Sequence, residues 1–291
     1  MKKDIKETIT AEIITMIESA QASGADWTMP FKSLGGKPTN ALTGKAYRGL
    51  NSLWLGMLGQ RTVATYKQWA ELGYQVQKGC KSTPISVPMM IKDKKTQDQK
   101  MIGFRGASVF AASAVLHGET GEAWAEPETV AIDLTERLDI ADQYVSSLGF
   151  DIRHSGEGRA YYSPAGDFIH MPERAAFSAT KTSTATENYY STLLHESAHC
   201  TGHSSRLDRL DLKNRKGYAF EELVAELSAA FLCNQLDVSG APRDDHAQYL
   251  ASWLNALGGD NDYIFKAASE AQKVVDWMDA KQVALPLQEA A

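Results

Sequence analysis

Apolar side chains recur at helical spacing at the start of the chain. Ile5, Ile9 and Ile13 follow one another at four-residue intervals, which predicts an amphipathic helix over residues 5–20. Periodicity and turn residues then predict two more helices and three strands before residue 125. These are helices at 51–59 and 65–73 and strands at 74–79, 83–91 and 107–115. Residues 1–125 are therefore predicted to form a small α+β domain.

The second half of the chain changes to short strands followed mainly by helices. Residues 126–133 are predicted to be a linker, and the next helix is predicted to end at Gly149. The pattern predicts a helix at 134–148, strands at 150–155 and in a hairpin at 159–172, and helices at 186–201, 220–236, 245–257 and 262–280. Residues 134–291 are thus predicted to be a mainly helical domain with a small antiparallel sheet, which makes the whole chain α+β.

Charge separates the two halves more sharply than composition does. The 43% hydrophobic and 23% charged residues are ordinary for a globular protein. Residues 1–125 carry 16 Lys and Arg against 10 Asp and Glu, whereas residues 126–291 carry 14 against 26. A polyanionic partner is therefore expected on the first half. Three scattered cysteines, together with the lack of a signal peptide or an apolar run of about 20 residues, predict a cytoplasmic protein without a membrane partner.

A metal-binding motif lies in the helix predicted at 186–201. The stretch YYSTLLHESAHCTGH places His195 and His199 four residues apart, so that both imidazoles face one point. Glu196 lies about 100° round the helix, where it reaches a metal-bound water rather than the metal. The motif predicts Zn²⁺, or another divalent metal such as Mn²⁺, with Glu196 as the catalytic general base.

The motif does not fix the third ligand. Glu222 and Glu226 share one face of the next long helix, among small residues that allow close packing. Their spacing resembles the gluzincin arrangement, and this resemblance implies that Glu222 binds the metal and Glu226 orients a metal-bound histidine. The reversed roles stay open. His203 is two turns from His195, and we predict that it is a surface or supporting histidine rather than a ligand.

Aromatic residues alternate with cations and amides in the first half. This composition is typical of single-strand binders, because bases stack on aromatic rings at about 1–3 kcal/mol each while cations follow the phosphates. The residues predicted to bind DNA are Trp27, Lys32, Lys37, Asn40, Lys45, Tyr47, Arg48, Asn51, Trp69, Lys78 and Lys81. The alternative, that the aromatics are core and the cations a solvated surface, stays open.

These motifs together resemble the ArdC-type antirestriction proteins of conjugative plasmids. The stretches P-T-N-A-L-T-G-K-x-Y-R-G-L-N and Y-K-Q-W resemble that family's N-terminal single-stranded-DNA-binding domain. The stretches H-E-S-A-H-C-T-G-H-S-S-R-L-D-R and E-E-L-V-A-E-L-S-A-A-F-L-C resemble its zincin-like metallopeptidase domain. The resemblance covers nearly the whole chain.

The resemblance implies a function at DNA transfer between bacterial cells. It implies a cytoplasmic protein of donor and recipient cells that binds single-stranded DNA entering the recipient and protects it from host restriction. A protein of the host restriction system is then a candidate target of the metallopeptidase site. A non-enzymatic DNA shield with a vestigial or structural metal site stays open as the alternative.

Overall fold

The computed structural model describes residues 5–22, 37–92, 99–126, 134–179, 183–210, 215–238, 259–260 and 262–282. The DNA contacts predicted for Trp27 and Lys32, the linker at 127–133 and the helix at 245–257 lie outside these residues. Within the described ranges, no helix combines the length and the apolar character that a membrane span requires.

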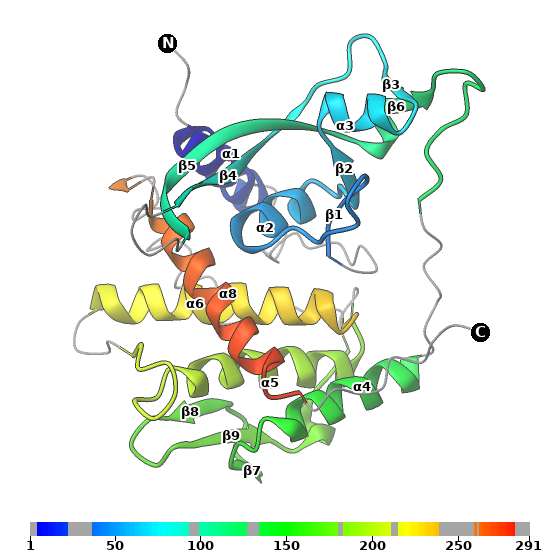
Figure 1. The fold of residues 1–291 in the computed structure, drawn as a ribbon. Helices are drawn as coiled ribbons and strands as arrows, with labels where there is room; N and C mark the ends of the chain where they lie inside the picture. The colour runs from blue at the N-terminus through cyan, green and yellow to red at the C-terminus, as the bar shows by residue number, and fades with distance from the viewer. Residues whose placement is uncertain are drawn as a thin grey trace.

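The N-terminal part is built on a four-stranded sheet with the order β1-β2-β5-β4. Its antiparallel hairpin pairs Thr83 with Val109 at one end and Lys92 with Gln99 at the other, and it curves over α1 and α2 (Figure 1). The bounds are α1 (Ile5–Ala22), β1 (Thr39–Asn40), α2 (Gly49–Met57), β2 (Thr62–Ala64), α3 (Tyr66–Glu71), β3 (Tyr74–Val76), β4 (Thr83–Lys92), β5 (Gln99–Ala111), a 3₁₀ turn at Ala112–Ala114 and β6 (Val115–His117).

The predicted N-terminal helices and the strands at 74–79 and 83–91 are present, but the strand predicted at 107–115 is divided, because a 3₁₀ turn at Ala112–Ala114 separates β5 from β6. The α3 helix begins with a capping box in which the Thr65 side chain accepts from the Gln68 amide, while the Gln68 side chain accepts from the Thr65 amide. Strand β5 begins eight residues before the predicted start at 107. The extra residues mix polar residues and glycines with Met101, Ile102 and Phe104 and carry no regular alternation, but they pair along β4, with a shift in register between Met89 and Met90.

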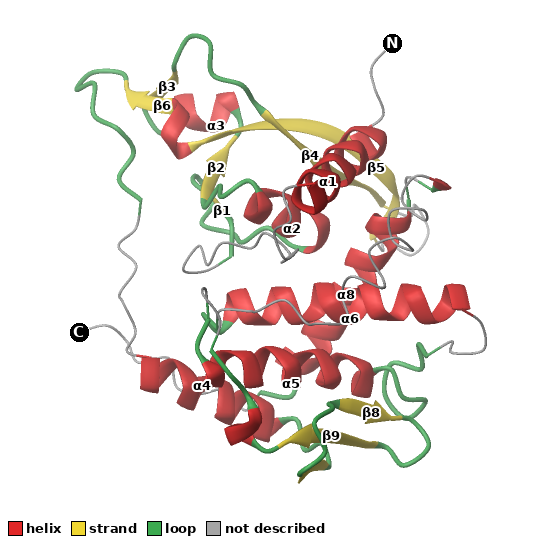
Figure 2. Ribbon diagram, turned by 180° about the vertical axis from the view of Figure 1, so that it is seen from behind, coloured by secondary structure: helices red, strands yellow, loops and turns green. Residues whose placement is uncertain are grey.

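The C-terminal part stacks a small sheet and three helices in layers, as Figure 2 shows from behind. The sheet packs on α5, α5 packs on α6, and α6 packs on α8. The bounds are α4 (Leu134–Ser147), β7 (Ile152–Ser155), β8 (Tyr161–Ser163), β9 (Phe168–Pro172), a 3₁₀ turn at Arg174–Ala176, α5 (Ala185–Thr201), α6 (Arg215–Gln235) and α8 (Tyr263–Asp279).

The small sheet has the order β7-β9-β8 and is mixed, not antiparallel as predicted. The β8–β9 hairpin is antiparallel, but β7 pairs with β9 in parallel. Hydrophobic alternation sets which residues share a face, yet it carries no information on strand direction.

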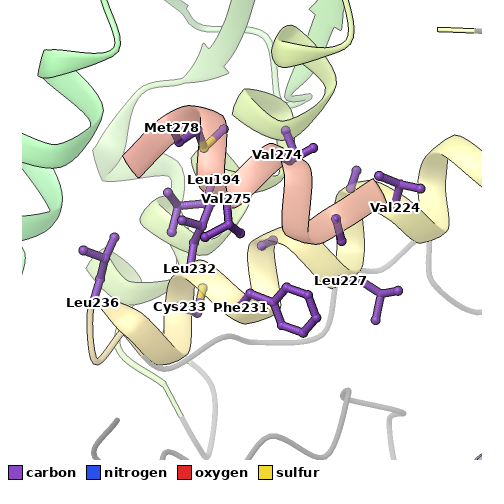
Figure 3. Close-up of a cluster of buried hydrophobic side chains, with 14 of the residues drawn as sticks. Leu194, Val224, Leu227, Phe231, Leu232, Cys233, Leu236, Val274, Val275 and Met278 are labelled. Carbon is purple, nitrogen blue, oxygen red and sulfur yellow. The ribbon is translucent and has the colours of Figure 1, made fainter. Parts of the chain in front are cut away.

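One hydrophobic core joins the two parts. From α2, the side chains of Leu50, Leu53 and Trp54 belong to the same buried cluster as those of α5, α6 and α8. Figure 3 shows the meeting of α6 and α8 in this cluster. Polar contacts reinforce the junction, since the Gly49 amide donates to Gln272 Oε1 at 2.8 Å. The apolar face of α2 is therefore covered by the C-terminal part of the chain.

Candidate metal centre

Helix α5 positions the histidine pair. Its first turn is fixed by a capping box between Thr184 and Glu187. Its last turn ends at Gly202, where a side-chain β carbon would lie 2.8 Å from the Leu210 side chain. A residue larger than glycine would therefore displace the loop that follows the helix. This loop supplies further contacts to the site.

The donor groups of three residues, carried by two helices, converge on one point. The Nε2 atoms of His195 and His199 are 3.1 Å apart. From α6, the two oxygens of Glu222 lie 3.6 Å from His195 Nε2 and 3.6 Å from His199 Nε2. Ligands at about 2.1 Å from a tetrahedral zinc ion are separated by about 3.4 Å. The set therefore fits a divalent metal, and these three residues form a possible metal-binding group among the described residues.

Two more carboxylates lie behind the histidines. Glu226 Oε1 is 2.9 Å from His195 Nδ1, and Glu221 Oε1 is 3.0 Å from His199 Nδ1. Each imidazole thus directs one nitrogen at a carboxylate and the other at the metal position, which is the usual arrangement around metal-bound histidines. The geometry favours Glu222 as the ligand and Glu226 as the orienting residue over the reverse assignment.

The acidic side chains are held ionised although they are buried. Burial by itself raises the pKa of Glu222, but hydrogen bonding and charge from His195 and His199 outweigh it and lower this pKa to about 2. Burial likewise opposes ionisation of Glu221, but hydrogen bonds with His199 and Arg209 bring its pKa below the usual value. Glu222 and Glu221 are therefore carboxylates rather than carboxylic acids, the form in which a glutamate binds a metal or accepts a hydrogen bond from an imidazole.

Three further residues near the motif differ in their relation to the site. Glu196 and Tyr218 lie beside the proposed ligands, whereas His203 does not belong to the three-residue group. Glu196 is only 3% exposed and follows His195 on α5. Tyr218 lies one turn before Glu222 on α6 and hydrogen-bonds its carboxylate. His203 instead contacts Ser205 Oγ, 2.8 Å from its Nδ1, and is not a member of the three-residue group.

Sequence reasoning missed two residues of this centre, Glu221 and Arg209. Glu221 directly precedes the predicted ligand, so the paired glutamates of "FEELVAEL" were a usable signal. Helical periodicity places adjacent residues about 100° apart and therefore gave them no common role. Arg209 follows the helix in the motif "SSRLDRL", and no spacing rule connects it to a glutamate twelve residues away.

Several residues predicted to bind DNA are part of the fold. Trp69 is fully buried, and its indole donates to the Phe110 carbonyl at 2.9 Å, so its predicted role in base stacking is contradicted. The Asn51 side chain pairs with the backbone of Ser86 through bonds of 2.6 and 2.9 Å. The Asn40 carboxamide oxygen accepts from residues 42 and 43 of its own turn. These amides complete the backbone hydrogen bonding of strands and turns.

The other predicted DNA contacts divide between the junction with α8 and the rest of the surface. Arg48 pairs with Asp276 of α8, and burial lowers the pKa of Lys37, although the nearby Asp279 and Asp276 act to raise it. Tyr47 is half-buried, with its hydroxyl 3.2 Å from Asn40 Nδ2. The remaining side chains, those of Lys45, Lys78 and Lys81, are exposed. Among the described residues that were predicted to bind DNA, only these three lysines are cations that lie away from the junction with α8.

Comparison with known proteins defines the class. One family model, described as the N-terminal domain of anti-restriction factor ArdC, matches residues 3–125, and another, described as a zincin-like metallopeptidase, matches residues 139–270. The fold and the site thus define an ArdC-type N-terminal domain joined to a zincin-like metallopeptidase domain. The chain belongs to the ArdC antirestriction family.

Solved and curated relatives cover the chain almost completely. The antirestriction ArdC protein from R388 plasmid is 36% identical, with a TM-score of 0.73 for its metal-free structure over 96% of this chain and 97% of that one. Its Mn(II)-bound structure gives a TM-score of 0.74 over 98% of this chain and 100% of that one. The y4eC protein of Sinorhizobium fredii is 38% identical over 96% of this chain and 92% of its own length.

A longer protein contains the same unit. DNA primase TraC of Escherichia coli is 33% identical over 96% of this chain, which spans 27% of that primase. A second TraC primase is 31% identical over 97% of this chain, which spans 20% of its length. The relatives together support an antirestriction role, an interaction with DNA and a divalent metal site at the cluster of His195, His199 and Glu222.

Proposed function

We propose that this protein binds single-stranded DNA entering a recipient cell during conjugation, protects it from host restriction enzymes, and carries a zinc-peptidase-type site. DNA binding is assigned to residues 1–125 and the metal site to residues 134–291, with residues 126–133 between them. The protein is expected to act in the cytoplasm of donor and recipient cells. A protein of the host restriction system is the proposed target of the site.

The supported metal site carries the enzymatic part of this proposal. A zinc ion held by His195, His199 and Glu222 would supply a bound water whose pKa falls towards about 7. Glu196 is buried and directly follows His195 on α5, where its carboxylate would serve as the general base that takes a proton from such a water and returns it to the leaving amine. A purely structural metal site has no use for such a general base, which is why the peptidase is preferred to the shield.

The exposed surface of the N-terminal part supports a revised DNA contact. Tyr66 is 61% exposed at the start of α3 and directly precedes exposed Lys67. The Asn40 side chain donates to Gln68 Oε1 at 3.1 Å, which holds the turn carrying Lys45 beside this helix. An exposed ring next to cations is what unspecific binding of single strands requires. We therefore propose that Tyr66 is a base-stacking residue, the role that buried Trp69 does not fill.

The deciding experiment compares protection of incoming DNA in cells carrying wild type, Glu196→Ala or Glu157→Ala. Glu157 is an exposed carboxylate and serves as the matched control. Loss of protection with Glu196→Ala alone, at unchanged abundance, metal content and DNA affinity, is the expected result. Equal protection by all three proteins would favour the non-enzymatic shield. Mass spectrometry of the metal in protein taken from the same cells would distinguish zinc from manganese.

A further inference from the structure

A buried arginine ties the loop after α5 to the third carboxylate of the centre. The side chain of Arg209 is only 7% exposed. Its guanidinium donates to both oxygens of Glu221, from Nε at 3.0 Å and from Nη2 at 2.8 Å. It also donates to the Ala198 carbonyl at 2.7 Å and to Thr201 Oγ1 at 2.9 Å. These bonds join α6 to the last turn of α5, the turn that carries His199.

The arginine makes an ionised carboxylate possible at this depth. The Glu221 side chain is 4% exposed, and a carboxylate buried to this degree is costly unless a cation and hydrogen bonds compensate it. A planar guanidinium bound through two parallel bonds supplies both at fixed geometry. Glu221 is therefore held as an anion whose position is set by Arg209.

That anion lies against His199. Glu221 Oε1 is 3.0 Å from His199 Nδ1, and an ionised carboxylate can only accept a hydrogen bond from that nitrogen. The proton of the neutral imidazole is thereby held on Nδ1, which leaves the Nε2 lone pair directed at His195 and Glu222. Only this tautomer can bind a cation at the metal position.

We infer that Arg209 is a positioning residue of the metal site, which acts through Glu221 to fix the ring and the tautomer of His199 and so strengthens binding of a divalent cation. The role rests on the metal site of the proposed function. Outer partners of metal-bound histidines typically change metal affinity by about 10- to 100-fold. The contribution of Arg209 is expected in that range.

The same loop contains a matched control. Arg206 donates to both oxygens of Asp167 at 2.8 and 2.9 Å and to the Cys200 carbonyl at 3.0 Å. It thus makes the same kind of paired bonds and also holds the end of α5. Among the described residues, the ion pairs of Asp167 are with Arg206 and His203, and neither of these is a proposed metal ligand. A general loosening of the loop should follow from loss of either arginine, whereas a defect of the metal site should follow only from loss of Arg209.

The test compares full-length wild type, Arg209→Gln and Arg206→Gln. Zn²⁺ and Mn²⁺ affinities are measured by competition with a chelator, the Tm is measured without metal, and the visible spectrum of the Co²⁺ form reports coordination geometry. Arg209→Gln should lower affinity by about 10- to 100-fold and change the Co²⁺ spectrum. Arg206→Gln should lower the metal-free Tm while leaving affinity within about twofold, a bound set by additivity of separate sites. Arg209→Lys keeps the charge without the fork and should recover part of the affinity.

The outcomes separate this role from the site itself. Equal loss of affinity in both glutamine variants, or a lower Tm with unchanged affinity in Arg209→Gln, would overturn the inference while leaving the metal site in place. If Arg209→Gln does not fold, Glu221→Gln replaces it, because it removes the anion behind His199, and an affinity equal to wild type would overturn the inference. Absence of metal binding by wild type would overturn the metal site and this role together.

Discussion

The metal centre and the proposed DNA surface differ in how closely the predicted residues are brought together. At the centre, three glutamates of α6 all contact the histidine pair: Glu222 contacts both rings at the metal position, Glu226 lies behind His195 and Glu221 lies behind His199. In the N-terminal part, residues of suitable chemistry are spread over the core, the junction with α8 and the surface. Trp69 is buried, Arg48 pairs with Asp276, and Lys45 is exposed.

The difference follows from what each function demands. A metal requires a few side chains that converge within a few ångströms, and such convergence leaves a fixed spacing in the sequence. A single strand requires only accessible rings and cations, and the same residue types also build cores and salt bridges. Composition therefore overstates a DNA surface, whereas spacing identifies a metal centre.

The largest expected effect is removal of a metal ligand. His195→Ala and Glu222→Ala should each reduce metal affinity by more than the roughly 100-fold limit expected for an outer partner. The metal-dependent increase in Tm should disappear with it, because the ion joins α5 to α6. Metal content and Tm measured with and without chelator check this, with Glu196→Ala as the control that retains metal. If Glu226→Ala loses the metal while Glu222→Ala keeps it, the two glutamates are reversed.

The next effect concerns the core of the N-terminal part. Trp69→Ala should lower the free energy of unfolding by about 3–5 kcal/mol, because it removes a fully buried indole packed against Tyr74 and Trp124. Urea unfolding of the full chain measures this loss. A variant that keeps wild-type stability but loses DNA binding would show that Trp69 contacts DNA after all.

A smaller effect is expected at the exposed ring. Tyr66→Ala should weaken binding of single-stranded DNA by about 1–3 kcal/mol, since one stacked base is lost, and should leave the Tm unchanged. Fluorescence anisotropy with a labelled oligonucleotide measures the affinity. Tyr161→Ala is the control, because Tyr161 is also an exposed tyrosine, at 38%, but lies in the C-terminal part. Equal affinities of the two variants would remove Tyr66 from the proposed site.

The smallest effect is expected at the junction. Arg48 and Asp276 form a solvent-exposed pair, so a double-mutant cycle with alanine at both positions should give a coupling of about 0–1 kcal/mol. DNA affinity of Arg48→Ala should stay close to that of wild type, because this cation already faces α8. A loss as large as that of Tyr66→Ala would return Arg48 to the DNA surface.

Much of the fold was readable from the sequence because local rules governed it. The Thr65 capping box and the stop at Gly149, which has a φ of 67°, follow from residue type alone. The parallel pairing of β7 with β9 depends instead on tertiary contacts. The central position of α2 had an unused signal, since residues 53–57 form a run without a polar side chain, a pattern typical of a helix buried on more than one side.

The metal centre could likewise be predicted only in part from the sequence. His195, His199 and Glu222 share one geometric requirement, and helical spacing expresses it. Arg209 and Glu221 are joined by a buried ion pair between a loop and a helix, which leaves no periodic trace. For the DNA contacts, exposure was the missing quantity, and it separates Tyr66 from Trp69 although only two residues lie between them.

The common core of α2, α6 and α8 has a consequence for how this gene segment can be rearranged. A recombination junction between the two halves would leave Leu53 and Trp54 uncovered on one product, and an apolar patch of this kind promotes aggregation. The N-terminal and C-terminal halves are therefore expected to be inherited together. The alignments to the two TraC primases agree with this, because they cross both halves without a break in coverage, at 96% and 97% of this chain, inside much longer polypeptides.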